Sequence, residues 1–223
     1  MLNYQRMNIF LVIPAFNEGE RLPAVLTGAS RFLPKGKIIV VDDGSLQPIK
    51  TKSALVIRHR LNLGKGAAMK TGAEYAFGEK ADAVIFMDAD GQHDPKELPN
   101  FASRLEKGFD VVFGSRQPGL SVPLTRLLGN KFASIYINLL FNIYISDILS
   151  GYRALTKKAY RLLSWESSRY GVETEIVARL GKNLQRLKWT EFPIETIYID
   201  KYKGVTIIDA IKVLVNTLWW RLF

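Results

Sequence analysis

The first half of the chain alternates between short apolar segments and longer segments with helical spacing. The short segments are rich in branched side chains, and they predict buried strands at residues 8–13, 37–41, 55–58, 83–87 and 111–113. Between them, apolar residues recur with the period of a helix at residues 21–32, 65–77 and 95–107. This alternation restricts the chain to an α/β fold with a mainly parallel central sheet and flanking helices. In such a sheet, ligands bind at the carboxyl ends of the strands.

Composition narrows the classes of protein further. The chain has 223 residues, which favours one domain with an appendage. It contains no cysteine, and this excludes disulfides, thiolate metal sites and cysteine nucleophiles. Its formal net charge of +10 attracts anions such as nucleic acid, nucleotide phosphates or an acidic membrane surface. No window of about 20 residues is uninterruptedly apolar, so we expect no simple membrane-spanning helix.

The second half contains two amphipathic segments. Residues 123–141 predict one long helix, and a polar stripe with a four-residue spacing follows it: Arg126, Asn130, Ser134 and Asn138. Residues 204–223 predict a C-terminal amphipathic helix that ends near Trp219 and Trp220. We therefore expect a domain at residues 1–203 and an interface helix at residues 204–223.

Two shorter elements lie between these segments. Residues 172–182 predict a helix, and residues 187–199 predict an extended segment that Pro193 interrupts.

Two carboxylates stand where one buried strand ends, in the segment Asp-Ala-Asp-Gly-Gln-His at 88–93. A loop at this point can aim both carboxylates at one cation, and Mg²⁺ and Mn²⁺ favour oxygen ligands that they share with substrate phosphates. The alternative is a solvated acidic turn. A second acidic strand end, Val-Asp-Asp-Gly-Ser at 41–45, favours the metal site, because two anionic strand ends in a basic chain indicate a gathered cation and ligand.

A third segment, Asn-Leu-Gly-Lys-Gly-Ala-Ala at 62–68, leads into a predicted helix. Gly64 and Gly66 would let the backbone approach a ligand closely. The free amides at the start of the helix, together with Lys65, favour an anion. The spacing is not that of a Walker loop, and a plain helix-capping turn explains it equally well.

Together these segments resemble the family 2 glycosyltransferases of the GT-A fold, and in particular the polyprenyl-phosphate sugar transferases, the dolichyl-phosphate mannose or glucose synthase group. The matching segments keep the order of that family and span roughly residues 8–200. They are Val-Ile-Pro-Ala-Phe-Asn-Glu at 12–18, the segments at 41–45 and 62–67, Asp-Ala-Asp-Gly-Gln at 88–92, Gly-Ser-Arg at 114–116 and Asp-Ile-Leu-Ser-Gly-Tyr-Arg at 147–153.

The resemblance implies a donor site and a metal site. It places the nucleotide sugar against Pro14, Ala15, Glu18, Asp42, Lys65 and Asp88. It implies that Mg²⁺ or Mn²⁺ is held at the DXD motif of the family, by Asp88, Asp90 and Gln92. The ion would neutralise charge on the leaving nucleoside diphosphate.

For the acceptor phosphate, the candidate residues are Arg116, Arg126, Asn130, Lys131, Ser134 and Arg153. Ordinary surface charges remain the alternative for Arg126 and Lys131. Asp90, Asp147 and Arg116 form the expected catalytic set. Whether Asp147 is a general base stays open, because a phosphate monoester with a second pKa of about 6 is already largely ionised.

Glu173 and Glu175 also lie in a segment similar to one of the family, and a solvated helix face is an equally good interpretation.

The implied activity is the inverting transfer of a hexose from a UDP- or GDP-linked sugar to a polyprenyl phosphate such as dolichyl phosphate. We expect a peripheral protein on the cytoplasmic face of a membrane, attached through residues 132–145 and 205–223. The alternative is that these helices pack on the core or on a second copy of the chain. A homodimer through the C-terminal helix is a further expectation.

Three other functions account for parts of this pattern. A glycosyltransferase of the same fold with a glycan or lipid hydroxyl acceptor would need Asp147 as an indispensable base. A sugar-phosphate nucleotidyltransferase usually has a Gly-rich loop containing Arg after its first strand, whereas this loop is Pro-Ala-Phe-Asn-Glu. A basic nucleic-acid-binding domain would explain the net charge but not the acidic pair Asp88 and Asp90, so we expect no nucleic-acid partner.

Overall fold

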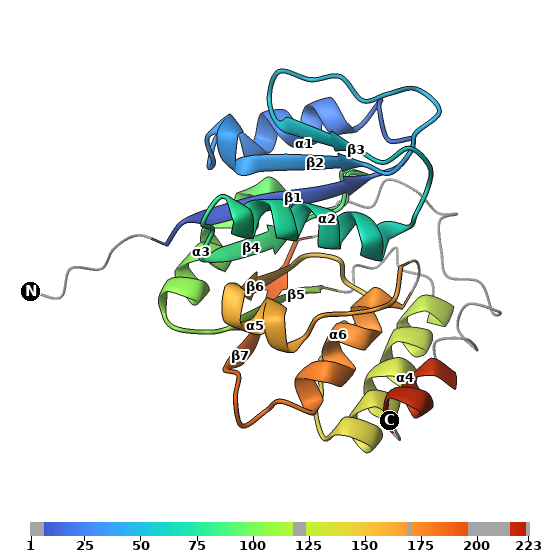
Figure 1. Ribbon diagram of the computed structural model, residues 1–223. Coiled ribbons are helices and arrows are strands. Elements are labelled where there is room, and N and C mark those ends of the chain that lie inside the picture. The colour runs from blue at the N-terminus through green and yellow to red at the C-terminus, as the bar shows by residue number, and fades with distance from the viewer. Residues whose placement is uncertain (1–6, 118–123, 169–170, 196–214, 222–223) are drawn as a thin grey trace, which may run out of the picture.

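The computed structural model describes residues 7–117, 124–168, 171–195 and 215–221, without the side chains of residues 124–127. Within these residues, seven strands form one sheet in the order β3-β2-β1-β4-β6-β5-β7 (Figure 1). The strands are β1 (Ile9–Ala15), β2 (Ile38–Asp42), β3 (Leu55–Arg58), β4 (Ala83–Phe86), β5 (Val111–Arg116), β6 (Arg153–Thr156) and β7 (Trp189–Ile194). The α-helices are α1 (Leu22–Ala29), α2 (Lys65–Gly78), α3 (Leu98–Glu106), α4 (Leu124–Phe141), α5 (Lys157–Leu162) and α6 (Val172–Gly181). Two 3₁₀ turns, η1 (Lys35–Lys37) and η2 (Pro95–Glu97), complete these elements.

The predicted α/β class with a mainly parallel sheet is confirmed. Every strand pair in the sheet is parallel except the two that involve β6, which runs antiparallel to β4 and β5. The five strands predicted in the first half are all present, and so are the three helices between them. Strand β6 and helix α5 were not predicted. The strand has four residues, of which only Ala154 and Leu155 are apolar, so no period is visible in it.

Strand β7 lies at the edge of the sheet and confirms the predicted extended segment. Pro193 sits inside the strand, paired with Ser115 of β5, instead of breaking it. An edge strand tolerates proline because one of its sides has no neighbouring strand to receive an N–H group.

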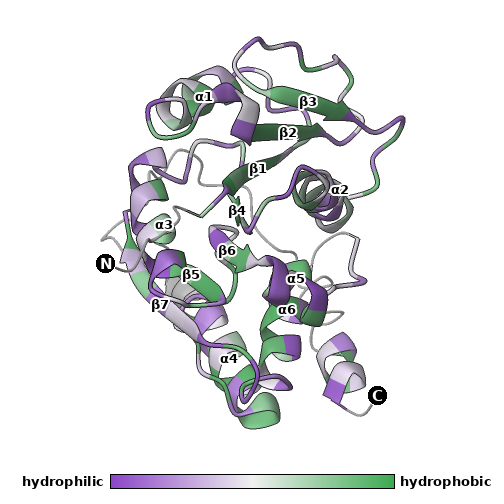
Figure 2. Ribbon diagram, turned by 60° about the vertical axis from the view of Figure 1, so that its left-hand side comes forward, coloured by the Kyte–Doolittle hydropathy of each residue, from purple (hydrophilic) through white to green (hydrophobic). Residues whose placement is uncertain are grey.

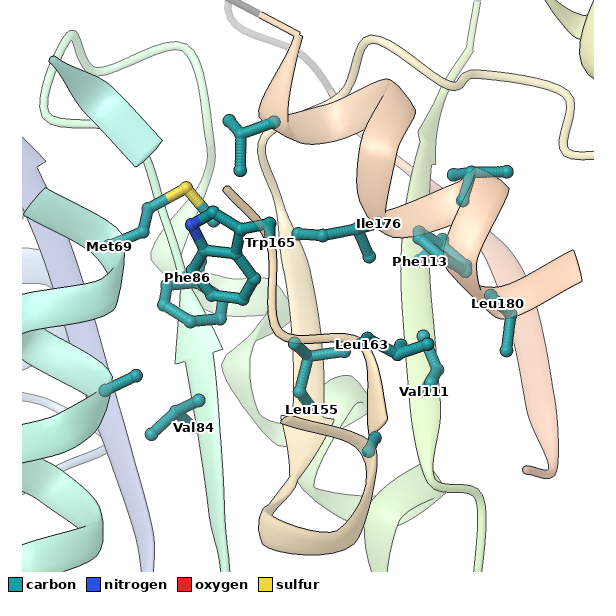
Figure 3. Packing of buried hydrophobic residues seen from close by; sticks show 14 of the residues in the cluster. Met69, Val84, Phe86, Val111, Phe113, Leu155, Leu163, Trp165, Ile176 and Leu180 are labelled. Carbon is teal, nitrogen blue, oxygen red and sulfur yellow. The ribbon is translucent and has the colours of Figure 1, made fainter. Parts of the chain in front are cut away.

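Two apolar layers cover the sheet, one on each face. Alternate residues of β1 point to opposite layers: Phe10 and Val12 belong to one core cluster, Leu11 and Ile13 to the other. Helices α1 and α2 lie on opposite sides of β1 and β2 (Figure 1), and these strands are hydrophobic along their length (Figure 2). In the layer of α2, Trp165 stands edge-on to Phe86 beside Met69 (Figure 3).

Helix α4 confirms the long helix predicted at residues 123–141, and it is only partly covered. Ile137 and Phe141 are buried in the core. The opposite side exposes a stripe of apolar residues at helical spacing, which we call the α4 stripe: Leu128, Phe132, Ile135 and Leu139.

Residues 215–221 are helical, and Trp220 packs against the core cluster that includes α4. The rest of the predicted C-terminal helix and the proposed domain boundary at residues 203 and 204 lie outside the described residues. No helix in the described part of the chain combines the length and apolar character needed to cross a membrane.

The close packing of α2 on the sheet gives a first prediction. A Cβ atom at Gly72 would lie 2.3 Å from Cγ1 of Val12 and 3.1 Å from Cγ2 of Val41. We expect Gly72→Ala to lower the free energy of unfolding by about 1–3 kcal/mol, because the core must shift to admit the methyl group.

The matched control is Gly78→Ala, at the end of the same helix, where a Cβ meets nothing within 4 Å. Urea unfolding of both variants measures the difference. An unchanged stability of Gly72→Ala would contradict the packing described for α2 and β1.

Candidate active site

The parallel strands deliver their carboxyl ends to one edge of the sheet, and most of the predicted site residues meet there. Ala15 ends β1, Asp42 ends β2, and Asp88 follows β4 by two residues. Arg116 ends β5. The antiparallel β6 begins at this same edge with Arg153.

Asp42 is fully buried and bonded to its own loop. Its carboxylate accepts hydrogen bonds from the backbone N–H groups of Ser45 (3.0 Å) and Ile49 (3.1 Å) and from the Arg58 guanidinium. Burial alone would raise the pKa of Asp42, but these hydrogen bonds outweigh it and the pKa is lowered. Contact of Asp42 with a nucleotide base stays a prediction.

The loops after β1 and β2 are tied to each other. The backbone N–H of Asn17 donates to Ser45 Oγ (3.0 Å), and Leu46 N–H donates to Asn17 Oδ1 (2.9 Å). Pro14 and Glu18 are half-buried in this region, and Ala15 is buried. These hydrogen bonds therefore hold the predicted nucleotide-binding residues of β1 and β2 close together at the ends of the two strands.

Asp43 organises the start of α2. Its carboxylate accepts from Leu63 N–H (2.9 Å), Gly64 N–H (2.7 Å) and His59 Nδ1 (2.7 Å). Ala67 N–H donates to the carbonyl of Ser168 (3.2 Å). The prediction that free amides here favour a ligand anion is therefore wrong for these groups, because the protein supplies its own acceptors.

Lys65, the first residue of α2, bridges two carboxylates. Its Nζ lies 2.6 Å from Asp88 Oδ1 and 2.8 Å from Glu173 Oε1. Burial would lower the pKa of Lys65, but the charges of Asp88 and Glu173 raise it above its usual range. Burial would likewise raise the pKa of Asp88, yet the charge of Lys65 and its hydrogen bond to Asp88 hold that pKa at about 2.

Asp90 differs from Asp88 in its balance of charge. Burial and the nearby negative charge of Asp88 raise the pKa of Asp90, and Glu18 adds to this. Asp90 Oδ1 accepts from the backbone N–H of Gln92 (3.0 Å), so Asp90 and Gln92 share one tight turn. Asp90 is therefore a carboxylate whose charge the neighbouring cations do not fully compensate.

His93 closes this turn and is itself buried. Its Nδ1 accepts the backbone N–H of Asp88 (3.1 Å), and its ring stacks on Tyr152 at 4.9 Å. Burial is the main reason that its pKa falls to about 4, so the imidazole is neutral at pH 7. His93 thus fixes the backbone of Asp88 without adding positive charge.

Arg116 and Asp147 form a bidentate ion pair beside the Asp88 turn. Arg116 Nε and Nη2 donate to Asp147 Oδ2 (2.6 Å) and Oδ1 (2.9 Å), and the Arg116 backbone N–H adds a bond of 3.1 Å. The charge of Arg116 reaches Asp88, where it contributes to the lowered pKa. Asp147 is buried and Arg116 is part-exposed, so the guanidinium is the accessible partner.

Arg153 is fully buried, and its guanidinium donates hydrogen bonds to backbone carbonyls. It donates to the carbonyls of Glu173 (3.0 Å), Ile148 (3.2 Å) and Ser150. This burial does not support the predicted contact of Arg153 with an acceptor phosphate. Its place in the site is to fix the loop that carries Asp147.

The solvated helix face considered for Glu173 and Glu175 is wrong. Glu175 is fully buried and accepts from Glu166 N–H, Ser167 N–H and Arg179 Nε at 2.7–2.9 Å. It anchors the loop that crosses the start of α2, where a Cβ at Gly66 would lie 1.9 Å from the carbonyl of Ser167. Gly66 is thus required by internal packing.

The polar stripe of α4 points partly inward. Asn130 Nδ2 donates to the carbonyl of Ser146 (3.1 Å), next to Asp147 in the chain. Asn130 Oδ1 and the buried Ser134 Oγ have no hydrogen-bond partner among the described residues. Lys131 is exposed, and Arg126 lies in the first turn of α4, where side chains are not described.

The donor set at Asp88 suits a hard divalent ion. In the described part of the chain, no three His, Cys, Asp or Glu side chains form a complete metal site. Asp88, Asp90 and Gln92 offer oxygen ligands on one turn, and burial together with the charge of Asp88 raises the pKa of Asp90. Mg²⁺ and Mn²⁺ commonly take one or two carboxylates and complete their shell with water and substrate phosphates, so the residues fit such an ion.

Three residues of the site escaped the sequence analysis in their structural roles: Asp43, His93 and Glu173. Each acts through partners that are remote along the chain, such as Asp43 with Gly64 or Glu173 with Lys65. The available signals were the two acidic motifs, which contain Asp43 and His93, and the segment similar to one of the family, which contains Glu173.

Comparison with known proteins adds independent findings. The family model described as Glycosyl transferase family 2 matches residues 10–163. Polyprenol monophosphomannose synthase of Mycolicibacterium smegmatis is 34% identical over 221 residues, which cover 90% of this chain and 83% of that protein. UDP-N-acetylglucosamine–dolichyl-phosphate N-acetylglucosaminyltransferase of Methanococcus voltae is 29% identical over 244 residues, covering 96% of each.

Among solved structures, glucosyl-3-phosphoglycerate synthase from Mycobacterium tuberculosis, in complex with Mn²⁺, uridine diphosphate and phosphoglyceric acid, is similar with a TM-score of 0.75. The identity is 20%, and the match covers 96% of this chain and 78% of that one. At this identity the likeness shows the shared fold.

The role of Asp43 gives a prediction about stability. Asp43→Asn keeps the shape of the side chain but turns an NH₂ group toward one of the N–H donors. We expect the free energy of unfolding to fall by about 1–3 kcal/mol, because the buried Gly64 N–H or its neighbour loses its acceptor.

Glu79→Gln, an exposed position at the end of α2, removes the same charge and should change stability by less than about 0.5 kcal/mol. Guanidinium unfolding compares the two. Equal stabilities would show that Asp43 does not anchor the loop.

Proposed function

The chain belongs to glycosyl transferase family 2, and we propose that it transfers one hexose from a UDP- or GDP-linked sugar to a polyprenyl phosphate, such as dolichyl phosphate. The transfer is a single displacement that inverts the anomeric carbon, and it takes place on the cytoplasmic face of a membrane. The names of the relatives in M. smegmatis and M. voltae support a polyprenyl acceptor.

The main support from the site is the pairing of an anionic turn with an accessible guanidinium. Asp88 and Asp90 lie at the end of β4, and Arg116 lies close enough to lower the pKa of Asp88. An anionic turn suits a metal-bound diphosphate, and a guanidinium suits a phosphate acceptor. A sugar between the two would face both the leaving group and the nucleophile.

The donor side follows from the corner between β1 and β2. Pro14, Ala15, Glu18 and Asp42 lie at or just after the ends of β1 and β2, where the base and ribose would bind. Lys65 and Asp88 border the diphosphate. A divalent ion held by Asp88, Asp90 and Gln92 would neutralise the charge that builds on the departing nucleoside diphosphate.

On the acceptor side, the phosphate has to be oriented more than it has to be deprotonated. A polyprenyl phosphate oxygen is already ionised near neutral pH, since the second pKa of such a phosphate is about 6. Asp147 orients Arg116 through two parallel bonds, and Arg116 in turn binds and orients the acceptor phosphate. Asn130, Lys131 and Ser134, with Arg126 on the same helix, extend this polar path along α4.

A hydroxyl acceptor is the alternative, and the geometry disfavours it. A general base must turn an oxygen toward the hydroxyl that it deprotonates. Both oxygens of Asp147 are instead bonded to Arg116. We therefore assign Asp147 as a positioning residue and Arg116 as the group that touches the acceptor.

The α4 stripe supports attachment to a membrane. Leu128, Phe132, Ile135 and Leu139 expose 45–78% of their surface on one side of the helix, and Lys131 lies beside them. Val215, Leu218 and Trp219 add exposed apolar surface in the C-terminal helical segment. Apolar side chains flanked by cations, in a chain of charge +10, suit the interface of an anionic bilayer, where a polyprenyl phosphate resides.

The reaction is tested by supplying UDP- and GDP-sugars with Mn²⁺ and measuring the release of nucleoside diphosphate, with and without polyprenyl phosphate. We expect release to require the lipid and one class of donor. Asp90→Asn should lower the rate by about 100-fold or more, because it removes charge from the proposed metal site. Release that proceeds equally without the lipid, or only with a hydroxyl acceptor, would contradict the proposed acceptor.

Attachment to the membrane is tested on the α4 stripe. Phe132→Glu with Leu139→Glu should weaken binding to phosphatidylglycerol vesicles at least about tenfold, because two apolar contacts are replaced by charges that the bilayer repels. Phe32→Glu with Tyr75→Glu places the same charges on exposed apolar residues elsewhere and serves as the control. Vesicle sedimentation that falls equally for both pairs would show that net charge alone attaches the protein.

A further inference from the structure

Lys65 is placed between a proposed metal ligand and a carboxylate that the proposed reaction does not use. Its Nζ lies 2.6 Å from Asp88 Oδ1 and 2.8 Å from Glu173 Oε1. The side chains of Lys65 and Asp88 are 32% and 26% exposed, whereas that of Glu173 is 13% exposed. Asp88 is thus open to an incoming ion, and Glu173 is the enclosed end of the bridge.

The surroundings hold Glu173 in place. It lies in the first turn of α6, and the buried Arg153 donates to its backbone carbonyl (3.0 Å). Burial would raise the pKa of Glu173, but Lys65 and Arg153 lower it, so the side chain stays an anion. A buried, ionised carboxylate of this kind is costly unless a cation remains beside it.

The backbone of the loop that follows Asp147 covers the bridge. A Cβ at Gly151 would lie 2.5 Å from Asp88 Oδ2 and 2.6 Å from Lys65 Nζ. The ammonium group therefore has little free space on this side. Among the described residues, the carboxylates available to it are the two that it already contacts, Asp88 and Glu173.

An ion at Asp88 conflicts with this arrangement. Oxygen ligands of Mg²⁺ or Mn²⁺ lie roughly 2 Å from the metal, so an ammonium bonded to the same carboxylate competes for its electron pairs and repels the ion. We expect Lys65 to leave Asp88 when the ion is bound, because two positive charges on one carboxylate repel each other. A lysine without a second partner would then carry an uncompensated charge in a half-buried position.

We propose that Glu173 is a positioning residue that retains Lys65 when Asp88 becomes a metal ligand. Lys65 exchanges the Asp88 bond for Glu173 and is left pointing at the edge where the donor diphosphate binds. The inference rests on the metal site of the proposed function. It adds that, without the metal, the ammonium of Lys65 neutralises Asp88. Glu173 then receives Lys65 when the ion binds.

The test measures binding of Mn²⁺ alone by electron paramagnetic resonance, without nucleotide and without turnover. Glu173→Gln should weaken binding about tenfold, because Lys65 then stays on Asp88. Lys65→Met should tighten binding about tenfold, because the competing ammonium is gone. The two variants are expected to move the affinity in opposite directions, so a general loss of structure cannot imitate the result.

A double variant separates positioning from simple charge. In the Lys65→Met background, Glu173→Gln should have much less effect than in the wild type, because Glu173 acts through Lys65. An undiminished effect in that background would show that Glu173 attracts the ion through space, and it would overturn the proposal. Glu166→Gln removes an exposed glutamate from the neighbouring loop and is the control for net charge.

The outcomes also distinguish this inference from the proposed function. Mn²⁺ binding that is lost in Asp90→Asn but unchanged in both Lys65→Met and Glu173→Gln would keep the metal site and overturn the exchange. Absence of Mn²⁺ binding in the wild type, with nucleoside diphosphate present as well, would overturn the metal site itself.

Discussion

The candidate site depends on the balance between buried carboxylates and the cations beside them at the carboxyl end of β4. Asp88, Asp90 and Glu173 come together there, and Lys65 bridges Asp88 and Glu173. Arg153 adds a positive charge near Glu173. His93 is neutral, and the charge of Arg116 is paired with that of Asp147. The parallel sheet makes this crowding possible, because β1, β2, β4 and β5 all end at one edge. The oxygen donors of Asp88, Asp90 and Gln92 on one turn are what suits this edge to a divalent ion.

The site separates residues that hold the structure from residues that are available to a ligand. Asp43 accepts from a backbone N–H group, Arg153 donates to backbone carbonyls, and Glu175 forms an ion pair with Arg179. These internal bonds fix the loops around the site. Arg116 and Lys65 remain partly exposed, each fixed by a more deeply buried carboxylate. The same division explains α4, whose inner side meets Ser146 through Asn130 while its outer side is apolar and exposed.

Much of the fold could be predicted from the sequence, because buried parallel strands are apolar runs and their helices keep a regular period. The strands at 8–13 and 83–87 and the helix at 65–77 were placed within a few residues. The family resemblance was likewise confirmed by the match over residues 10–163. Strand β6 and the burial of Arg153 could not be predicted, since four residues show no period and the partners of Arg153 lie in other loops and helices. Lys65 and Glu173 are 108 positions apart, and only the folded chain brings them together.

The central claim is that donor and acceptor phosphates meet at this one edge. It is tested by phosphorus NMR of a nucleoside diphosphate and a short-chain polyprenyl phosphate bound together, with Mn²⁺ added in trace amounts. Bound Mn²⁺ broadens the signals of nearby phosphorus nuclei. The account predicts that both the diphosphate and the lipid phosphate signals broaden, and that Asp90→Asn abolishes the broadening of the lipid phosphate signal. A diphosphate signal that broadens while the bound lipid phosphate stays sharp would contradict it.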